Sequence, residues 1–190
     1  GAAEEKAEGA LAGAAGGQHG GAELLEPDAL VEPDLDSLVH ALPRALPRRA
    51  FARFGVEAKG YGVVTLHRPS NVDSPAGLRR VLVELRRIAR DTPLLFPVHP
   101  RTANRIEALG IPPSPDLRMI APMGYLDFLS VLGEARFVIT DSGGVQEETT
   151  FLGVPCLTLR TTTERPVTVT EGSNTLVGDD PRVLYPLVLK

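Results

Sequence analysis

The chain has 190 residues, of which 43% are hydrophobic, so it can form one domain of ordinary size with a core of its own. Its net charge is −4 with acidic and basic residues intermixed, which provides no broad basic field for nucleic acid or an anionic membrane. The single cysteine, Cys156, excludes an internal disulfide, no apolar run approaches the ~20 residues of a membrane span, and the Ala/Gly-rich start does not resemble a signal peptide, so we expect a cytoplasmic protein.

The first part of the chain shows no strand pattern. Residues 1–35 are a low-complexity segment that starts with Ala, Gly and Glu, which offer too little apolar side-chain area to offset the entropy of ordering, so we predict disorder. Residues 36–60 begin with apolar positions at helical spacing, interrupted by Pro43 and Pro47. We interpret this segment as a broken helix or a linker.

From residue 61 onward, short apolar runs alternate with amphipathic stretches. The runs predicted as strands buried on both faces are 61–66, 94–98, 117–120 (the weakest), 137–140 and 155–159. The stretches predicted as helices are 75–90, 104–109, 126–134 and 145–152. This alternation predicts an α/β domain over residues 61–190, with a Rossmann-like parallel sheet and helices on both faces. In such sheets, ligands bind beyond the carboxyl ends of the strands.

The strongest functional signal is the run TDSGGVQEE at residues 140–148, which follows an apolar strand and opens a helix. Gly143 and Gly144 let a ligand approach the backbone, and the first-turn amides of a helix favour an anion such as a diphosphate. Ser142 adds a hydroxyl donor, and Glu148 is placed to accept hydrogen bonds from a ribose diol. The structural alternative is that Ser142 only caps the helix and the glycines form a tight turn.

Three further polar runs follow predicted strands. The first carries His67 and Arg68, which can donate to a phosphate and pair with it, and the second repeats the pattern with His99 and Arg101. The third, RTTTERP at residues 160–166, offers hydroxyls and guanidiniums suited to phosphate or sugar. Each run taken alone fits a structural contact or a solvated loop. Because a parallel sheet brings all four loops to one edge, their convergence favours a binding site.

A bound nucleotide base also needs an apolar, flat contact. Tyr125 and Phe128 open the helix before the strand at 137–140, and either ring can stack on a heterocycle, although aromatics in such places are commonly core residues. The sequence has no P-loop lysine motif, no HExxH zinc site and no GxSxG elbow. We therefore expect neither metal nor serine-nucleophile chemistry.

These four runs, in this order and spacing, resemble the C-terminal domain of the non-hydrolysing UDP-N-acetylglucosamine 2-epimerases, and the resemblance covers residues 36–190. It implies one half of a two-domain enzyme of the GT-B arrangement, with UDP-sugar in the cleft. The family is an isomerase family that interconverts UDP-GlcNAc and UDP-ManNAc by elimination and re-addition of UDP, without a cofactor. It further implies a role in cell-surface polysaccharide biosynthesis, and a homodimer or a complementing N-terminal half as partner.

The same resemblance implies roles for individual residues. His67 would be the catalytic residue, close to the leaving UDP. The substrate-binding residues would be Arg68, Asn71, His99, Phe128, Ser142, Gly143, Gly144, Glu148 and Arg165. Within this set, the serine and glycines would hold the diphosphate, Glu148 the ribose, Phe128 the uracil face and Arg165 the phosphates. Arg68 and His99 resemble positions that line the cleft or a regulatory UDP-sugar subsite.

The chain also departs from the family pattern. In the family, the carboxylates that move the C2 proton belong to the N-terminal domain, and nothing in residues 1–54 resembles that domain. We expect a fragment or split-gene product, truncated at both ends relative to the family, that supplies the UDP-binding half. The alternatives are a nucleotide-sugar-dependent glycosyltransferase of the same architecture and a non-catalytic UDP-sugar-binding domain.

Overall fold

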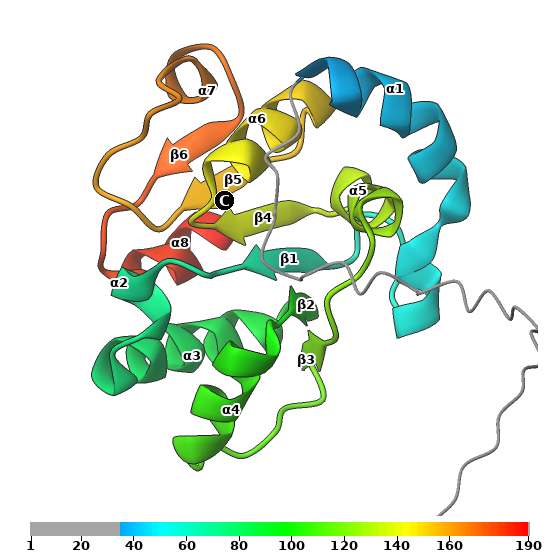
Figure 1. Cartoon of the computed structure of the whole chain (residues 1–190). Helices are drawn as coiled ribbons and strands as arrows, with labels where there is room; N and C mark the ends of the chain where they lie inside the picture. Colours follow the sequence, from blue (N-terminus) through cyan, green and yellow to red (C-terminus); the bar gives the residue numbers. More distant parts are fainter. Residues whose placement is uncertain (1–34, 190) are drawn as a thin grey trace, which may run out of the picture. The chain divides into compact units, whose positions relative to one another are not determined.

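The computed structural model describes residues 35–189. The prediction of disorder for residues 1–35 lies outside this range, except at Leu35, which begins a helix. Figure 1 shows the described residues as one sheet with helices packed against it. Among these residues, no helix is long and apolar enough to cross a membrane.

The centre of the fold is a parallel sheet of six strands in the order β3-β2-β1-β4-β5-β6. The strands are β1 (Gly62–Thr65), β2 (Leu94–Pro97), β3 (Leu117–Ile120), β4 (Phe137–Thr140), β5 (Cys156–Thr158) and β6 (Asn174–Leu176). The chain runs outward from β1 to β3 and then returns to β4 on the other side of β1, which creates a topological switch point between β1 and β4. The predicted Rossmann-like sheet is therefore confirmed, with β6 as an unpredicted edge strand.

Helices cover both faces of the sheet (Figure 1). One face carries α1 (Leu35–Ala45), α5 (Tyr125–Gly133) and α6 (Gly143–Leu152), and the other carries α3 (Pro75–Ala89), α4 (Pro100–Ala108) and α8 (Leu184–Val188). Successive strand residues feed the two cores alternately: Val63 packs with the first group and Val64 with the second. Short elements complete the fold: α2 (Pro69–Val72), α7 (Val167–Thr170) and η3 (Pro181–Val183).

The segment 36–60 is a broken helix that packs on the sheet, so its interpretation as a linker is wrong. Helix α1 continues through Pro43, which lies near its C-terminal end, and two 3₁₀ helices follow, η1 (Leu46–Arg48) and η2 (Ala50–Phe54). The amide of Ala50 donates to the Ser130 hydroxyl of α5 at 3.0 Å. Its buried apolar side chains belong to the core of that face: Leu38, Ala41, Ala45, Ala50, Phe51 and Val56.

Two helices begin earlier than the periodicity predicts, and both shifts affect the polar motifs. Helix α4 begins at Pro100 rather than at residue 104, because His99 caps it and proline fits the first helical position. Helix α6 begins at Gly143 rather than at residue 145. The glycine pair and the residues after His99 therefore lie in first turns of helices.

Candidate nucleotide-binding site

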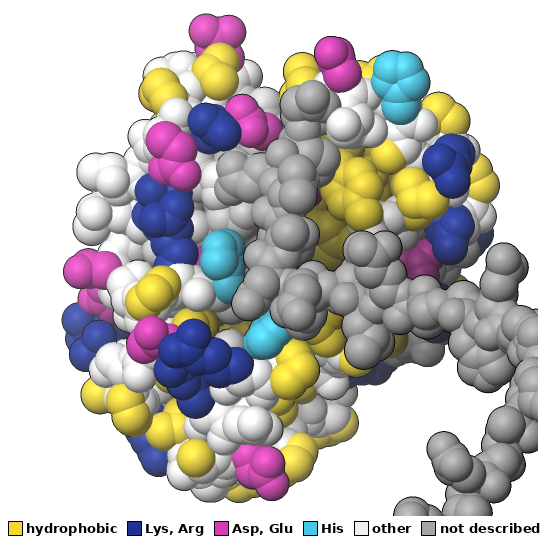
Figure 2. Space-filling view, in the orientation of Figure 1, with side chains coloured by type: hydrophobic (Ala, Val, Ile, Leu, Met, Phe, Trp, Pro, Cys, Tyr) yellow, Lys and Arg dark blue, Asp and Glu magenta, His cyan; other side chains and the backbone are white. Residues whose placement is uncertain are grey.

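The four polar runs follow β2, β1, β4 and β5, which are neighbours in the sheet. The strands are parallel, so all four loops leave the same edge, as predicted. The ends of β1 and β4 are aligned closely, because the hydroxyls of Thr65 and Thr140 lie 2.6 Å apart. Figure 2 shows basic and histidine side chains close together on one face of the molecule, with hydrophobic side chains nearer α5.

Asp141 joins the loops on the two sides of the switch point. Its side chain is fully buried and accepts hydrogen bonds from the amides of His67 (3.1 Å) and Arg68 (3.0 Å) and from the side-chain amide of Asn71 (2.8 Å). The Arg68 guanidinium donates to the backbone carbonyl of Asp141 at 2.9 Å. Burial raises the pKa of Asp141, but the hydrogen bonds from His67, Asn71 and Arg68 outweigh it, so its pKa lies below the ordinary value.

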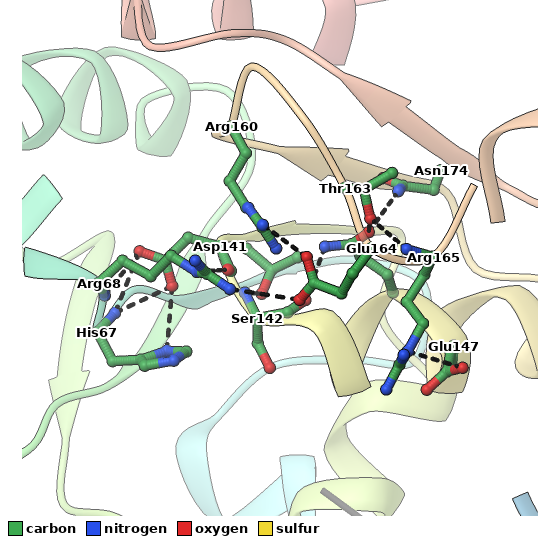
Figure 3. Close-up of polar contacts among 12 residues, drawn as sticks. His67, Arg68, Asp141, Ser142, Glu147, Arg160, Thr163, Glu164, Arg165 and Asn174 are labelled. Atoms are coloured by element: carbon green, nitrogen blue, oxygen red, sulfur yellow. Dashed lines mark hydrogen bonds and ion pairs between the residues drawn. The ribbon is translucent and has the colours of Figure 1, made fainter. Parts of the chain in front are cut away.

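The Asp141 carboxylate also contacts the imidazole of His67. Nδ1 of His67 lies 3.0 Å from the carboxylate, and the His67 side chain is 50% exposed (Figure 3). Sequence reasoning assigned no role to Asp141. A signal was available, since it is the first charged residue after a fully buried strand, but its partners lie about 70 residues away in the chain.

Gly143 and Gly144 begin α6 directly after Asp141 and Ser142. Ser142 stands at the N-cap position, but its side chain makes no capping hydrogen bond, so the interpretation of Ser142 as only a cap does not hold. Its amide donates to the Thr140 hydroxyl at 3.0 Å, which fixes the turn from β4 into α6. The backbone of Gly143 and Gly144 forms the first helical turn, the part of a helix that favours an anion.

Glu164 links the loop of residues 160–166 to the loop after β1. Its carboxylate accepts from Arg160 at 2.6 Å and pairs with Arg68 at 3.4 Å, so one carboxylate holds two guanidiniums (Figure 3). The hydrogen bond from Arg160 is the main cause that lowers the pKa of Glu164 to about 2. Glu164 is 43% exposed, which leaves this ion pair in contact with solvent.

Gln146 on α6 forms a buried link to the same loop, and the sequence did not predict this role. It is fully buried; its side-chain oxygen accepts from the Thr163 hydroxyl at 2.6 Å and from Asn174 at 3.1 Å. Its side-chain amide donates to the carbonyl of Ser142 at 3.0 Å. This single side chain therefore connects the glycine turn, the loop of residues 160–166 and strand β6.

The remaining predicted residues lie around this centre. Arg165 pairs with Glu147 on α6 at 3.0 Å (Figure 3), and Glu148 is buried on the same helix with 4% of its surface exposed. Phe128 is half-buried on α5 and packs against the core of that face. His99 is exposed at the end of β2, where its ring accepts from the amide of Arg101 at 3.3 Å. Within residues 35–189, no group of His, Cys, Asp or Glu side chains is arranged to hold a metal ion.

This fold and this site define a doubly wound α/β domain with polar loops gathered at the switch point of its sheet. Within that class, residues 32–188 match the family model described as UDP-N-acetylglucosamine 2-epimerase. The chain belongs to this family.

Relatives of known name support the assignment. The chain is 40% identical over 146 residues to the UDP-N-acetylglucosamine 2-epimerase of Methanocaldococcus jannaschii, an alignment that covers 74% of this chain and 40% of that protein. It is 41% identical over 133 residues to the UDP-2,3-diacetamido-2,3-dideoxy-D-glucuronate 2-epimerase of Pseudomonas aeruginosa, covering 69% of this chain and 37% of the relative.

A solved structure resembles the fold over the same region. It is the crystal structure of the M. jannaschii UDP-GlcNAc 2-epimerase in complex with UDP-GlcNAc and UDP, with a TM-score of 0.73 and 37% identity. The match covers 81% of this chain and 44% of that one. The chain thus spans less than half the length of these relatives.

Proposed function

We propose that this chain is the UDP-binding half of a cytoplasmic UDP-GlcNAc 2-epimerase, an isomerase that forms UDP-ManNAc by elimination and re-addition of UDP. One observation carries the proposal. At the switch point, Asp141 binds the backbone and the ring of His67 and directly precedes Ser142, where the glycine turn begins. Asp141 therefore places an imidazole, which can carry a proton, next to the start of a helix, which favours an anion. The related M. jannaschii structure, which holds UDP-GlcNAc and UDP, supports the nucleotide-sugar as ligand.

The proposed roles follow from the chemistry of each loop. Ser142, Gly143 and Gly144 hold the diphosphate through the first turn of α6, and Arg165 adds a guanidinium from the neighbouring loop. Glu148, deeper on α6, binds the ribose. His67 stands at the leaving UDP as the catalytic residue of this half.

Other proposed contacts lie at the edges of the site. Phe128, whose ring is half-buried in the first turn of α5 as that of Tyr125 is, stacks on the uracil. Arg68 and Asn71 bind the nucleotide-sugar from the loop after β1, and His99 binds it from the loop after β2. Arg68 is held by Glu164 in this structure, so it exchanges that carboxylate for phosphate on binding.

Under this proposal, turnover also requires proton-transfer groups that are not among the described residues. The proton at C2 of the sugar is moved by carboxylates of a complementing N-terminal half, and a homodimer is the proposed assembly. GT-B is the proposed arrangement of the two halves, and cell-surface polysaccharide biosynthesis the proposed process. The P. aeruginosa relative is named for a different UDP-sugar, so binding of the sugar needs a test separate from binding of UDP.

The test is a calorimetric titration of the chain with UDP in three forms: unchanged, Arg165→Ala and Arg182→Ala. Arg165→Ala removes a guanidinium proposed to contact phosphate, so UDP affinity should fall by roughly tenfold, which corresponds to about 1.4 kcal/mol. Arg182 is the matched control, because it is an exposed arginine on η3 whose ion pair is with Asp180, the residue before that helix. Equal affinities in all three forms would contradict the proposal.

The same samples are then given UDP-GlcNAc and assayed for UDP-ManNAc. UDP binding without product is the expected result for the nucleotide half alone. Product from the isolated chain would show that the proton-transfer groups lie within it, and the division of labour between two halves would be wrong.

A further inference from the structure

The Asp141 carboxylate makes more contacts than are needed to hold the ends of β1 and β4 together. Three donors from the loop after β1 already bind its carboxylate: two backbone amides and the side chain of Asn71. The fourth contact is different in kind, because it comes from the ring of His67, where Nδ1 lies 3.0 Å from Oδ1. A purely structural tie has no need of the imidazole.

The contact determines which ring nitrogen of His67 carries a proton. The lowered pKa of Asp141 keeps its carboxylate ionised at neutral pH, and an ionised carboxylate can only accept a hydrogen bond. Nδ1 must therefore be the protonated nitrogen, and Nε2 is the one whose proton comes and goes. The side chain is 50% exposed, so the ring is half-buried at the carboxyl end of β1.

We propose that Asp141 is a positioning residue that fixes His67 in the tautomer protonated at Nδ1, so that Nε2 is the nitrogen presented to the phosphates of the nucleotide. The inference rests on the proposed function for the identity of the ligand, but the tautomer does not. The buried negative charge also favours the doubly protonated ring, which is the form that donates to a phosphate oxygen. The other charged residues of the neighbouring loops are Arg68, next to His67 in the chain, and Glu164, which pairs with Arg68.

The chain provides an internal control in His99. There the ring Nδ1 accepts a hydrogen bond from the amide of Arg101 at 3.3 Å, so a neutral His99 carries its proton on Nε2. The two histidines should therefore show opposite tautomers in one sample. No substitution is needed for this first observation.

The experiment is ¹⁵N NMR of the histidine rings in the full chain without ligand, as a function of pH. We expect the Nδ1–H tautomer for His67 and the Nε2–H tautomer for His99. In Asp141→Asn, the His67 pKa should fall by about one unit. The matched control is Asp73→Asn, which removes a carboxylate that pairs with Arg101 and Arg105 instead, and should leave the His67 pKa unchanged.

UDP binding then separates this inference from the proposed function. The affinity of Asp141→Asn for UDP should fall several-fold at pH 7.5 and recover toward that of the unchanged chain near pH 5.5, where the ring is protonated in both. An Nε2–H tautomer for His67 in the unchanged chain overturns the inference, even if UDP binds normally or the variant does not fold. The expected tautomer without any UDP binding overturns the proposed function, and of the inference only the positioning of His67 by Asp141 is kept.

Discussion

The two ends of the candidate site are held together by different kinds of contact. At the switch point, the Asp141 carboxylate is fully buried and satisfied by donors from one loop. Across the site, the Glu164 carboxylate is 43% exposed and shared between Arg68 and Arg160. Buried polar groups are expensive to leave without partners, whereas exposed ion pairs contribute little to folding. The first contact therefore fixes geometry, and the second can be exchanged for a ligand.

The largest expected effect is that of Asp141→Ala. It leaves two backbone amides and the Asn71 side chain without their acceptor in the interior, so the free energy of unfolding should fall by about 3 kcal/mol. Urea denaturation followed by circular dichroism measures this change. A loss below about 0.5 kcal/mol, the size typical of a surface substitution, would mean that the Asp141 contacts do not hold the ends of β1 and β4 together.

Gln146→Leu tests the buried link beneath the exposed loop. It removes the acceptor of Thr163 and Asn174 and the donor to Ser142, so we expect about 2 kcal/mol of destabilisation. UDP affinity should fall as well, because the loop that carries Arg165 loses its buried hydrogen bond to α6 and keeps only the more exposed pair of Arg165 with Glu147.

The control for this change is Thr150→Val on the same helix. The Thr150 hydroxyl is buried without a hydrogen-bond partner among the described residues, so its removal should be neutral or stabilising. If both variants lose the same stability, any polar-to-apolar change on α6 has this effect and Gln146 is not a specific link.

Acid pH provides a further test of the buried Asp141 carboxylate. The pKa of Asp141 is lower in the folded protein than its unfolded value of about 3.9, so its stabilisation is complete above that value and is lost as the pH falls below it. Asp141→Asn should therefore be less stable at neutral pH, and its stability should fall less between pH 4 and pH 2 than that of the unchanged chain. Parallel stability curves for the two proteins would contradict this assignment.

The smallest effect should come from Glu164→Gln. This substitution removes an exposed charge, so the free energy of unfolding should change by no more than about 0.5 kcal/mol, measured by the same urea titration. A loss comparable to that of Asp141→Ala would remove the contrast between a fixed and an exchangeable end of the site.

The sequence predicts the parts of the site that depend on local pattern. Apolar runs mark five of the six strands, and the polar residues after them reach one edge because parallel strands end together. Strand β6 is not predictable in this way, since the run from Asn174 to Leu176 is mostly polar. The roles of Asp141 and Gln146 depend on partners such as Asn71 and Thr163, which only the fold brings near.

The helix boundaries teach the same lesson on a smaller scale. Proline and glycine are normally signals for turns, so periodicity starts the helices after Pro100 and after the glycine pair. In the fold, these residues form first turns instead, because a cap at His99 and a turn fixed by Thr140 begin the helices earlier. The two helices whose starts were predicted too late are therefore the two whose first turns lie in the candidate site.

The central claim is that the loops at the switch point hold the diphosphate of a nucleotide. The most direct test is a calorimetric comparison of UDP with uridine on the unchanged chain. We predict saturable binding of UDP, at least tenfold tighter than uridine, because the glycine turn of α6 and Arg165 act on the phosphates. Equal affinity for the two ligands, or no binding of UDP by the folded chain, would contradict the claim.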